Sequence, residues 1–415
     1  MTSIERREER YQRRKKEREN GTRRLDQLTF DDIFTFDNMW KSAKKSCKGS
    51  RWKHSTINFE VDIALQILKS YLALKEDKRR FRGYHSFKTV EHGKERDIDA
   101  LHISERMPQK CFADYLVNDL YTRTFIYDNS SSLKGKGMDF AFRRLNAQLR
   151  HHINKYGLEG GILSFDFKSF FASLEHKHIK EKARKRIKDP KLYKIFCDYV
   201  DDYRKLKNFD KTAEEARGIG LGSGDLSQLI ALDYASPIDY YVKHEKRIKG
   251  YGRYMDDGYV ISNSIDELKE VKDGISRVAE SIGIKLNPKK IKITPFRHHS
   301  FTFLKIKFTI KDSGRIIRKL SSKSKRSIKR KINKFREWVD EGKFDPEDAI
   351  ASYQSWRAYA LRFDGYKTLK KMDEYFVIKF KDELRDRKLP FKCTLKATKD
   401  KGSGWRYFKR GKLVW

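Results

Sequence analysis

The feature that most constrains this chain is a pair of adjacent carboxylates, Asp256 and Asp257, within an apolar and aromatic stretch at residues 251–261. β-prone residues lie on both sides of the pair, glycines stand at 252 and 258, and no proline interrupts the stretch. This pattern predicts a tight hairpin with an acidic tip. Neighbouring like charges are costly unless a positive charge lies beside them, so the hairpin predicts a divalent-metal site.

The tetrapeptide around this pair does not identify such a site by itself, because a near copy occurs earlier. Residues 199–202 have the same aromatic–apolar–Asp-Asp form. They lie in a charged segment, residues 177–210, with a helical pattern. We therefore expect Asp201 and Asp202 on a solvated helix face, and the order of the other motifs must decide which acidic pair forms the site.

The charge of the chain indicates a polyanionic partner. Its 415 residues include 95 Lys and Arg against 58 Asp and Glu, a net charge of +37. Such an excess raises self-repulsion, which nucleic acid relieves, and the 13% aromatic content suits base stacking. An anionic membrane is the second candidate partner, but no apolar run approaches the roughly 18–20 residues that span a bilayer, and the basic N-terminus lacks the apolar region of a signal peptide.

The four cysteines are far apart and form no Cys/His cluster, so neither zinc nor a disulfide framework is indicated, and a cytoplasmic location is expected.

Periodicity predicts helices and strands along the chain. The helices are expected over 59–79 (amphipathic), 111–123 and 265–283 (amphipathic). The strands are expected over 84–90 and 96–103, closed by residues 106–108, and as one strand over 301–308. The apolar residues of the basic run at 315–336 are too sparse for a core helix, so a helix that follows a phosphate backbone is expected there. A small helical domain is expected over 346–384, with Trp356, Tyr359 and Phe363 in its core.

Two glycine-containing segments could approach phosphates or bases closely. Lys134 and Lys136 alternate with glycines ahead of a helix that carries Arg143, although an ordinary surface turn would also explain them. Residues 218–228 place glycines at alternate positions before an apolar helix. This loop is not a dinucleotide-binding fingerprint, because no strand and no acid at the expected spacing accompany it.

An apolar strand that begins at residue 161 ends at Asp166, which alone could be a helix N-cap. On a strand adjacent to the hairpin, however, Asp166 would join Asp256 and Asp257. Three such carboxylates hold two Mg²⁺ ions roughly 3.5–4 Å apart. Hard oxygen ligands suit Mg²⁺, with Mn²⁺ as an alternative. The set predicts phosphoryl transfer in which the protein supplies placed charge and no nucleophile of its own.

The ordered motifs resemble those of reverse transcriptases. Residues 161–171 resemble the first palm motif of this family, 218–228 the second, 254–257 the third, 283–290 the fourth and 303–308 the primer-grip region; residues 96–110 and 125–145 resemble the finger motifs of bacterial enzymes. The resemblance implies an α+β right-hand polymerase fold. Its expected parts are a basic arm (1–24), an N-terminal region with fingers (25–160), a palm (161–312, with an insertion at about 177–217), a basic helical thumb (313–389) and a basic tail (390–415).

The resemblance also assigns roles. Asp166, Asp256 and Asp257 would bind metal with the backbone of Phe167, and Phe171 would be the aromatic gate that favours deoxynucleotides. Gly222, Ser227 and Gln228 would contact the nascent pair and template, and Lys289 or Lys290 would lie near the pyrophosphate. The remaining candidates are phosphate or template contacts (Lys134, Lys136, Arg143) and nucleic-acid contacts in the basic run (Lys323, Lys325, Arg326, Lys329, Arg330, Lys331).

The implied activity is RNA-directed DNA synthesis from dNTPs on a structured RNA template, with a DNA product strand and a small accessory protein as a further candidate partner. The second motif lacks the Pro-Gln-Gly form of retroviral and intron enzymes and ends in Ser227-Gln228. That ending resembles diversity-generating retroelement enzymes and defence-associated groups, and an extra residue favours the defence groups, hence an antiviral role. The alternatives are a diversity-generating enzyme, an RNA-binding scaffold with a polymerase fold, and an RNA-templated RNA polymerase.

Overall fold

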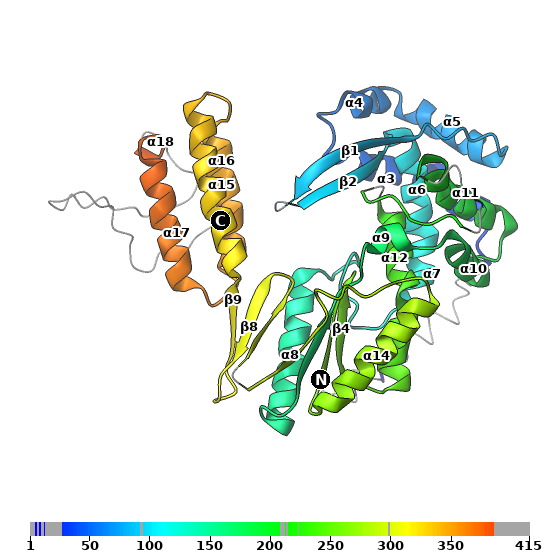
Figure 1. Cartoon of the computed structure of the whole chain (residues 1–415). Helices are drawn as coiled ribbons and strands as arrows, with labels where there is room; N and C mark the ends of the chain where they lie inside the picture. The colour runs from blue at the N-terminus through cyan, green and yellow to red at the C-terminus, as the bar shows by residue number, and fades with distance from the viewer. Residues whose placement is uncertain are drawn as a thin grey trace. The chain divides into compact units, whose positions relative to one another are not determined.

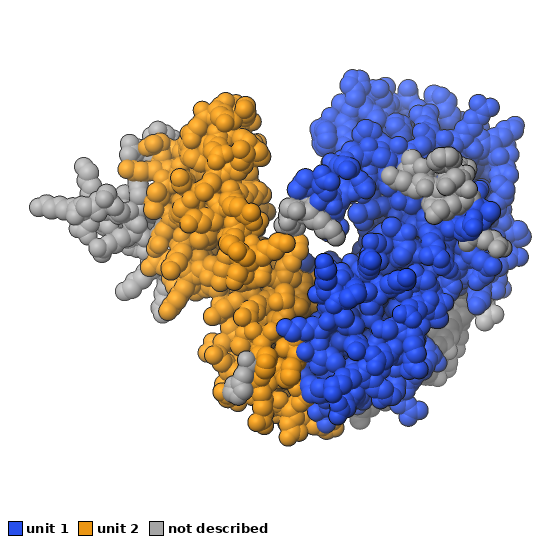
Figure 2. Space-filling model, in the orientation of Figure 1, with its two compact units in different colours: residues 1–152, 161–293 blue, residues 153–160, 294–415 orange. Residues whose placement is uncertain are grey.

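The computed structural model describes residues 27–385, apart from 92–93, 208–211, 213–214, 223 and 298, together with Glu5, Glu8, Glu9 and Gln12. The chain forms two compact units (Figure 2), residues 1–152 with 161–293, and residues 153–160 with 294–415. The expected tail at 390–415 and nearly all of the expected arm at 1–24 lie outside the described residues. Within the described part, no helix is long and apolar enough to cross a membrane.

The first unit begins with helices that surround one β-hairpin (Figure 1). The predicted strands at 84–90 and 96–103 are confirmed as the antiparallel pair β1–β2. The predicted helix over 59–79 is wrong as one element, because the backbone leaves helical geometry at Asp62. Residues 106–108 do not end the strands but lie within a helix, where Met107 and Pro108 are buried. The elements are α2 (Phe30–Ile33), α3 (Phe36–Cys47), α4 (His54–Val61), α5 (Ile63–Lys75), β1 (Tyr84–Glu91), β2 (Lys94–Leu101), α6 (Ile103–Phe112), the π-helix η2 (Ala113–Val117) and α7 (Asn118–Thr122).

A four-stranded sheet in the order β4-β5-β3-β6 positions the acidic residues. The predicted helix over 265–283 is confirmed as α14; Ser264 caps it by accepting a hydrogen bond from the backbone of Glu267, and α14 packs on β3 and β5. The elements are α8 (Met138–Tyr156), β3 (Gly161–Phe165), α9 (Phe170–Ser173), α10 (His176–Arg186), α11 (Pro190–Lys207), α12 (Asp225–Tyr234), α13 (Ser236–Tyr240), η3 (Tyr241–Glu245), β4 (Gly250–Tyr254), β5 (Asp257–Ser262), α14 (Ile265–Ser281) and β6 (Lys292–Pro295).

The second acidic pair lies on α11, as predicted, but its expected solvation is wrong. Asp202 is fully buried, and its carboxylate pairs with the Arg79 guanidinium at 2.6 Å. The same guanidinium pairs with Glu105 on α6, also at 2.6 Å. Asp201 pairs with Lys180 on α10 at 2.7 Å. Both carboxylates therefore hold helices together, because their helix turn faces neighbouring elements.

The second unit contains a three-stranded antiparallel sheet followed by a helical bundle. The single strand predicted at 301–308 is wrong, because Leu304 and Lys305 both adopt positive φ and separate β7 from β8. The basic run at 315–336 begins with strand β9, and the helix that follows buries an apolar face. In the expected domain at 346–384, Phe363 is buried, and Trp356 and Tyr359 are half-buried. The elements are β7 (Ser300–Phe303), β8 (Ile306–Ile310), β9 (Ile316–Leu320), α15 (Ser322–Asp340), α16 (Pro346–Ala360), α17 (Tyr366–Lys379) and α18 (Lys381–Arg385).

Candidate active site

The pairing of β3 with β5 brings Asp166 to the acidic hairpin. The two strands are antiparallel, and Phe165, the last residue of β3, lies opposite Gly258. Asp166 follows directly and is buried. A side chain at 258 could not be accommodated, because a Cβ atom there would lie 2.2 Å from the Phe165 ring. Gly258 thus permits the close strand approach that places Asp166 beside Asp257.

The predicted hairpin is confirmed, and its turn consists of Met255 and Asp256. Tyr254 on β4 pairs with Asp257 on β5. Met255 adopts a left-handed backbone conformation, with φ of 56°, which costs about 1–2 kcal/mol for an L-residue. Oxygen atoms of Asp166, Asp256 and Asp257 all lie within 4.8 Å of one another. The structure therefore brings together the three carboxylates that the sequence singled out.

Burial and mutual repulsion disfavour three negative charges at this site. Burial, with the charges of Asp256 and Asp166, raises the pKa of Asp257 to about 7. Burial and the charge of Asp166 also raise the pKa of Asp256, although Lys290 and Arg96 oppose this. A divalent cation would relieve both effects, and carboxylate oxygens are the ligands that hard cations prefer. The donor set thus fits a metal held by Asp166, Asp256 and Asp257.

The segment at 283–290 supplies a cation to the same carboxylates. The Lys290 ammonium donates to Asp166 at 2.5 Å, and the Asn287 backbone N–H donates to the Asp166 carbonyl at 2.8 Å. Partial burial opposes the charge of Lys290, but the hydrogen bond to Asp166 and the attraction of the carboxylates outweigh it and raise the Lys290 pKa. Lys289 is exposed, and its backbone N–H donates to the Asn287 side chain. Phe167 is buried and bridges to Leu286.

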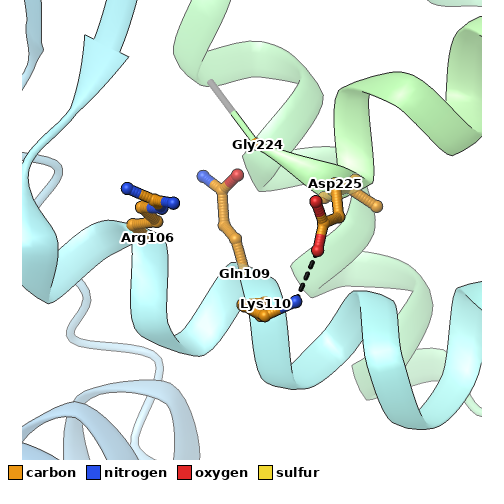
Figure 3. Close-up of a pocket in the computed structure, with 6 residues that line it drawn as sticks. Arg106, Gln109, Lys110, Gly224 and Asp225 are labelled. Carbon is orange, nitrogen blue, oxygen red and sulfur yellow. Dashed lines mark hydrogen bonds and ion pairs between the residues drawn. The ribbon is translucent and has the colours of Figure 1, made fainter. Parts of the chain in front are cut away.

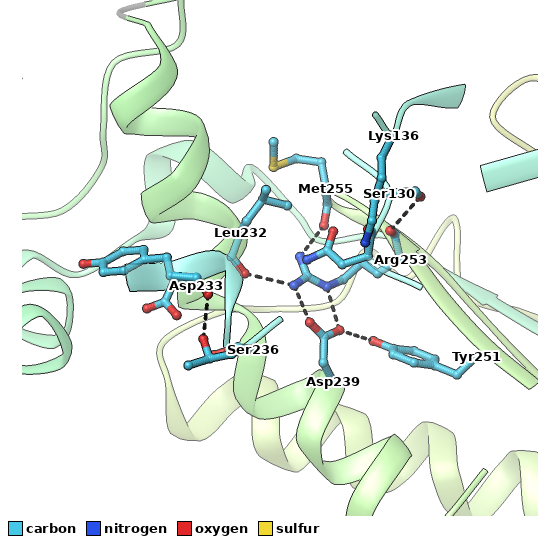
Figure 4. A network of polar contacts seen from close by, with 12 residues as sticks. Ser130, Lys136, Leu232, Asp233, Ser236, Asp239, Tyr251, Arg253 and Met255 are labelled. Atoms are coloured by element: carbon cyan, nitrogen blue, oxygen red, sulfur yellow. Dashed lines mark hydrogen bonds and ion pairs between the residues drawn. The ribbon is translucent and has the colours of Figure 1, made fainter. Parts of the chain in front are cut away.

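A buried ion pair holds the hairpin from behind (Figure 4). The Arg253 guanidinium is fully buried and binds the Asp239 carboxylate through two hydrogen bonds, at 2.8 and 2.6 Å. It also donates to the carbonyls of Met255 and Leu232, both at 2.9 Å. The Tyr251 hydroxyl donates to Asp239 at 2.6 Å. Arg253 thus fixes the left-handed turn residue that precedes Asp256. The sequence analysis missed this role, for which a charged residue inside an apolar strand is the available signal.

The backbone on the other side of Arg253 is also fixed. The Arg253 carbonyl accepts hydrogen bonds from the Ser130 backbone N–H at 3.0 Å and from the Ser130 hydroxyl at 3.1 Å. Its own N–H donates to the Asp128 carbonyl at 3.2 Å. The Asp128 carboxylate in turn pairs with Arg144 on α8 at 2.5 Å. The loop before α8 therefore secures β4.

The glycine loop at 218–228 contacts the β1–β2 hairpin. Gly222 has φ of 88°, and a Cβ atom there would lie 2.9 Å from the side chain of Ile98 on β2. The Asp99 N–H of the same strand donates to the Leu221 carbonyl at 3.0 Å. Arg96, two residues before Ile98, acts electrostatically on Asp256. Arg96 is a functional candidate that the sequence analysis did not name, although the finger resemblance begins there.

The remaining predicted contacts lie around this framework. Ser227 is buried, and the Gln228 side chain accepts a hydrogen bond from the Ser132 hydroxyl at 3.0 Å. Phe171 is half-buried, with its ring edge-on to Phe170. The Lys136 ammonium donates to the carbonyls of Tyr127 and Asn129, at 2.7 and 2.9 Å, so it closes its own turn. Lys134 and Arg143 are exposed.

A pocket lies between α6 and the start of α12 (Figure 3). Arg106, Gln109 and Lys110 line it from α6, and Gly224 and Asp225 from the end of the glycine loop. Lys110 pairs with Asp225. The buried Gln109 amide nitrogen has no hydrogen-bond partner among the described residues. The pocket is polar and carries more positive than negative side chains. Asp166, Asp256 and Asp257 are not among the residues that line it.

The candidate nucleic-acid contacts of the basic run lie on α15. Lys323, Arg326, Lys329, Arg330 and Lys331 are exposed, and Lys325 is half-buried. The opposite face packs Ile328, Ile332 and Phe335 into the core of the helical bundle. Lys331 donates to Ser352 at 2.9 Å, and the Lys329 ammonium lies 5.0 Å from the centre of the Tyr375 ring.

Comparison with known proteins identifies the class. The family described as reverse transcriptase (RNA-dependent DNA polymerase) matches residues 88–308, more than half of the chain. The chain therefore belongs to the reverse transcriptase family and has its right-hand polymerase fold. The Asp201–Asp202 pair lies outside the site, as the motif order predicted.

Two telomerase structures are similar to this chain. Telomerase from Candida albicans, in complex with a TWJ fragment of telomeric RNA, is 12% identical, with a TM-score of 0.43 over 74% of this chain and 60% of that chain. Apo telomerase from Candida tropicalis, truncated from its C-terminal domain, is 16% identical, with a TM-score of 0.41 over 61% of this chain and 59% of that chain. The match thus covers about 60% of each telomerase chain. No curated protein matches the chain.

Replacing Arg253 with Met should destabilise the protein strongly. The change leaves the buried Asp239 carboxylate without its cation, which costs about 3–5 kcal/mol. Tyr251→Phe is the matched control, because it removes one hydrogen bond to Asp239 and should cost about 1 kcal/mol. Denaturant unfolding measures both. Equal stability of Arg253→Met and the wild type would show that the ion pair does not hold the hairpin.

Asp257→Asn should stabilise the metal-free protein at high pH. Because the Asp257 pKa is about 7 in the fold, the folded chain binds more protons than the unfolded chain between about pH 4 and 7. The contribution of Asp257 to the free energy of unfolding therefore falls as pH rises through that window. Asp257→Asn has no titrating carboxyl at this position and does not lose that stability. We expect a gain of roughly 1–3 kcal/mol at pH 8 that shrinks toward pH 4. Thermal unfolding with chelator measures it.

Asp201→Asn is the control of opposite sign. Burial opposes the charge of Asp201, but the nearby His176 ring and the hydrogen bonds from the Lys180 ammonium outweigh it and lower the Asp201 pKa to about 2. Its contribution is present above the unfolded pKa near 4 and is lost as pH falls toward 2. Asp201→Asn should therefore destabilise the protein at pH 8. A pH-independent effect of Asp257→Asn would contradict the assigned repulsion.

Proposed function

We propose that this reverse transcriptase adds dNTPs to a 3′-hydroxyl by two-metal phosphoryl transfer on an RNA template. The observation that carries the proposal is the convergence of Asp166, Asp256 and Asp257, with oxygen atoms within 4.8 Å, at the meeting point of β3 and the β4–β5 turn. These carboxylates, with the backbone of Phe167, would hold two Mg²⁺ ions; Mn²⁺ is the alternative. When bound, the metals supply Lewis acidity toward the attacking hydroxyl and the leaving pyrophosphate.

The chain's own residues position the reactants. Arg253 and Gly258 fix the carboxylates, so little reorganisation is needed when substrate arrives. Lys290 pairs with Asp166 in the metal-free state and is the better placed of the two lysines to shift to the pyrophosphate. Lys289 is the alternative. Arg96 is a further candidate triphosphate contact, because its charge already acts on Asp256.

Two regions would bind the template and product strands. The pocket lined by Arg106, Gln109 and Lys110 offers cationic groups and a free amide donor beside the glycine loop, which suits a template phosphate. The exposed Lys and Arg side chains of α15 suit a nucleic-acid backbone. We retain fingers at 25–160, palm at 161–312 and thumb at 313–389 as the proposed parts, with Lys134 and Arg143 as lesser candidates.

We propose a dedicated structured RNA as the template and antiviral defence as the biological role. The support is the Ser227-Gln228 ending of the second palm motif and its extra residue. A diversity-generating role is the alternative, and a variable gene with a near-repeat beside the enzyme's gene would favour it. A small accessory protein remains a proposed partner.

Asp256→Ala should abolish DNA synthesis while RNA binding persists. The change removes a metal-binding carboxylate, so we expect primer extension to fall by more than about 100-fold. Asp201→Asn, in the similar tetrapeptide on α11, is the matched control and should keep activity within about threefold because Asp201 pairs with Lys180 outside the site. Extension of a DNA primer on RNA with Mg²⁺ and dNTPs measures both. Undiminished product from Asp256→Ala would favour the scaffold hypothesis.

Phe171→Ala should admit ribonucleotides. If the half-buried ring excludes a 2′-hydroxyl, removing it should lower the preference for dNTPs over NTPs by at least about tenfold in kcat/KM. Phe171→Tyr keeps the bulk of the ring and should retain the preference. A wild-type enzyme that already prefers NTPs would instead identify an RNA polymerase and remove the gate assignment.

A further inference from the structure

The outer face of α4 and α5 exposes an apolar row. Val61 is 75% exposed, Leu65 46%, Leu68 50% and Leu72 41%. We name these four residues the α4–α5 seam. The inner face of α5 instead buries Ile63, Ile67 and Leu74, and α5 packs on α3 and α6. The two helices lie at the edge of the first unit in Figure 1. Folding of the described residues therefore does not use the seam, and a row of this kind marks an interaction site.

The spacing within the seam is that of a helix pairing surface. Its members follow one another at intervals of four, three and four residues, which is the apolar repeat of paired helices. Ile57, one α4 turn earlier, and Trp52 are exposed as well and extend the apolar surface. The backbone break at Asp62 lies between the first and second members, so α5 carries the regular part of the row.

We propose that the α4–α5 seam binds a second copy of this chain, with the two α5 helices antiparallel about a two-fold axis. An axis between Leu65 and Leu68 places Leu65 of each copy on Leu68 of the other, and Leu72 on Val61. The surface is thus self-complementary, as a two-fold interface requires. Each apolar side chain then packs on another apolar side chain of the second copy.

The charges that flank the seam favour this partner and direction. Asp62 follows Val61 directly, and Lys69 follows Leu68, so both lie on the same flank. In the antiparallel arrangement, Asp62 of each copy lies beside Lys69 of the other, which gives two equivalent opposite-charge pairs. Both side chains are exposed, and neither makes an ion pair with another described residue of the chain. They are therefore available to a second copy.

Other occupants fit the seam less well. Residues 2–26 contain only three apolar side chains, at Ile4, Tyr11 and Leu25, too few to cover the row. RNA would contact cationic side chains, whereas the seam is apolar and its flank carries an acid, Asp62, beside a single lysine, Lys69. An anionic membrane would disfavour Asp62 in the same way. The proposal rests on these residues alone and is independent of the catalytic assignment.

Salt separates this association from one that RNA mediates. Two chains with a net charge of +37 repel each other, and salt screens that repulsion. Apolar contact does not weaken with salt, so nuclease-treated protein should remain dimeric at about 0.5 M salt, where the Debye length is only about 4 Å. Association through shared RNA should disappear under those conditions.

The test is sedimentation equilibrium of the nuclease-treated full chain at high salt. We expect a concentration-dependent dimer for the wild type and a dissociation constant at least about tenfold weaker for Leu68→Glu. Ile378→Glu on α17 is the matched control, because Ile378 is also an exposed apolar residue (68%) but belongs to the second unit, and it should leave the dimer unchanged. All changed positions are exposed, so thermal unfolding should match the wild type.

A charge exchange tests the antiparallel register. Measured on nuclease-treated protein near 0.15 M salt, where the Debye length is about 8 Å and exposed charges still interact, Asp62→Lys should weaken the dimer about tenfold by placing lysines beside Lys69. The double variant Asp62→Lys/Lys69→Asp should return to within about threefold of the wild type. A wild-type monomer at all concentrations would overturn the proposal, as would a dimer that Leu68→Glu leaves intact. Failure of the double variant to recover would overturn the register. Binding of monomers to anionic phospholipid vesicles through Leu68 would assign the seam to a membrane instead.

Discussion

The Arg253–Asp239 ion pair is the interaction on which the acidic hairpin, β4–β5, depends. A turn with a left-handed Met255 and two adjacent carboxylates is unfavourable in itself, because backbone strain and charge repulsion act at the same place. The guanidinium is fully buried and holds the Met255 carbonyl from below the turn. Separating the two partners would leave a buried charge without its counter-ion, which is costly. The pair therefore opposes a rearrangement of the turn that would relieve its strain and charge repulsion. The buried ion pair on the strand behind the turn thus offsets the unfavourable free energy of the turn itself.

The sequence predicted the local elements of the fold well where periodicity and turn residues agreed. The β1–β2 pair, β3 and α14 follow from such agreement. Prediction failed where one sequence pattern is compatible with two structures. The alternation over 301–308 fits either one strand or two strands joined by a turn. The turn at Leu304 and Lys305 contains no Gly, Asn or Pro to mark it. Burial of Asp202 could not be predicted, because it depends on Arg79, which is 123 residues away.

For the site, the order of motifs was more informative than any single motif. Asp166 and the hairpin were predicted as neighbours because strand ends of one sheet can meet. The pairing of Phe165 with Gly258 shows which register places Asp166 beside Asp257. The roles of Arg253 and Arg96 were not predicted, since each depends on a tertiary contact. Lys289 and Lys290 were indistinguishable in sequence. Both side chains are exposed in the fold, but of the two it is the Lys290 ammonium that pairs with Asp166.

The distribution of charge on α15 explains how the chain tolerates its basic excess. The basic run was expected to lack a core face, yet Ile328, Ile332 and Phe335 recur at four and three residues and anchor the helix in the bundle. The lysines and arginines between them project outward, where solvent screens their repulsion until a polyanion replaces it. Three buried apolar residues, with Val339 packed against them, therefore anchor a helix of nineteen residues. The same spacing on α5, where the outer apolar face meets no described element, has no such structural use.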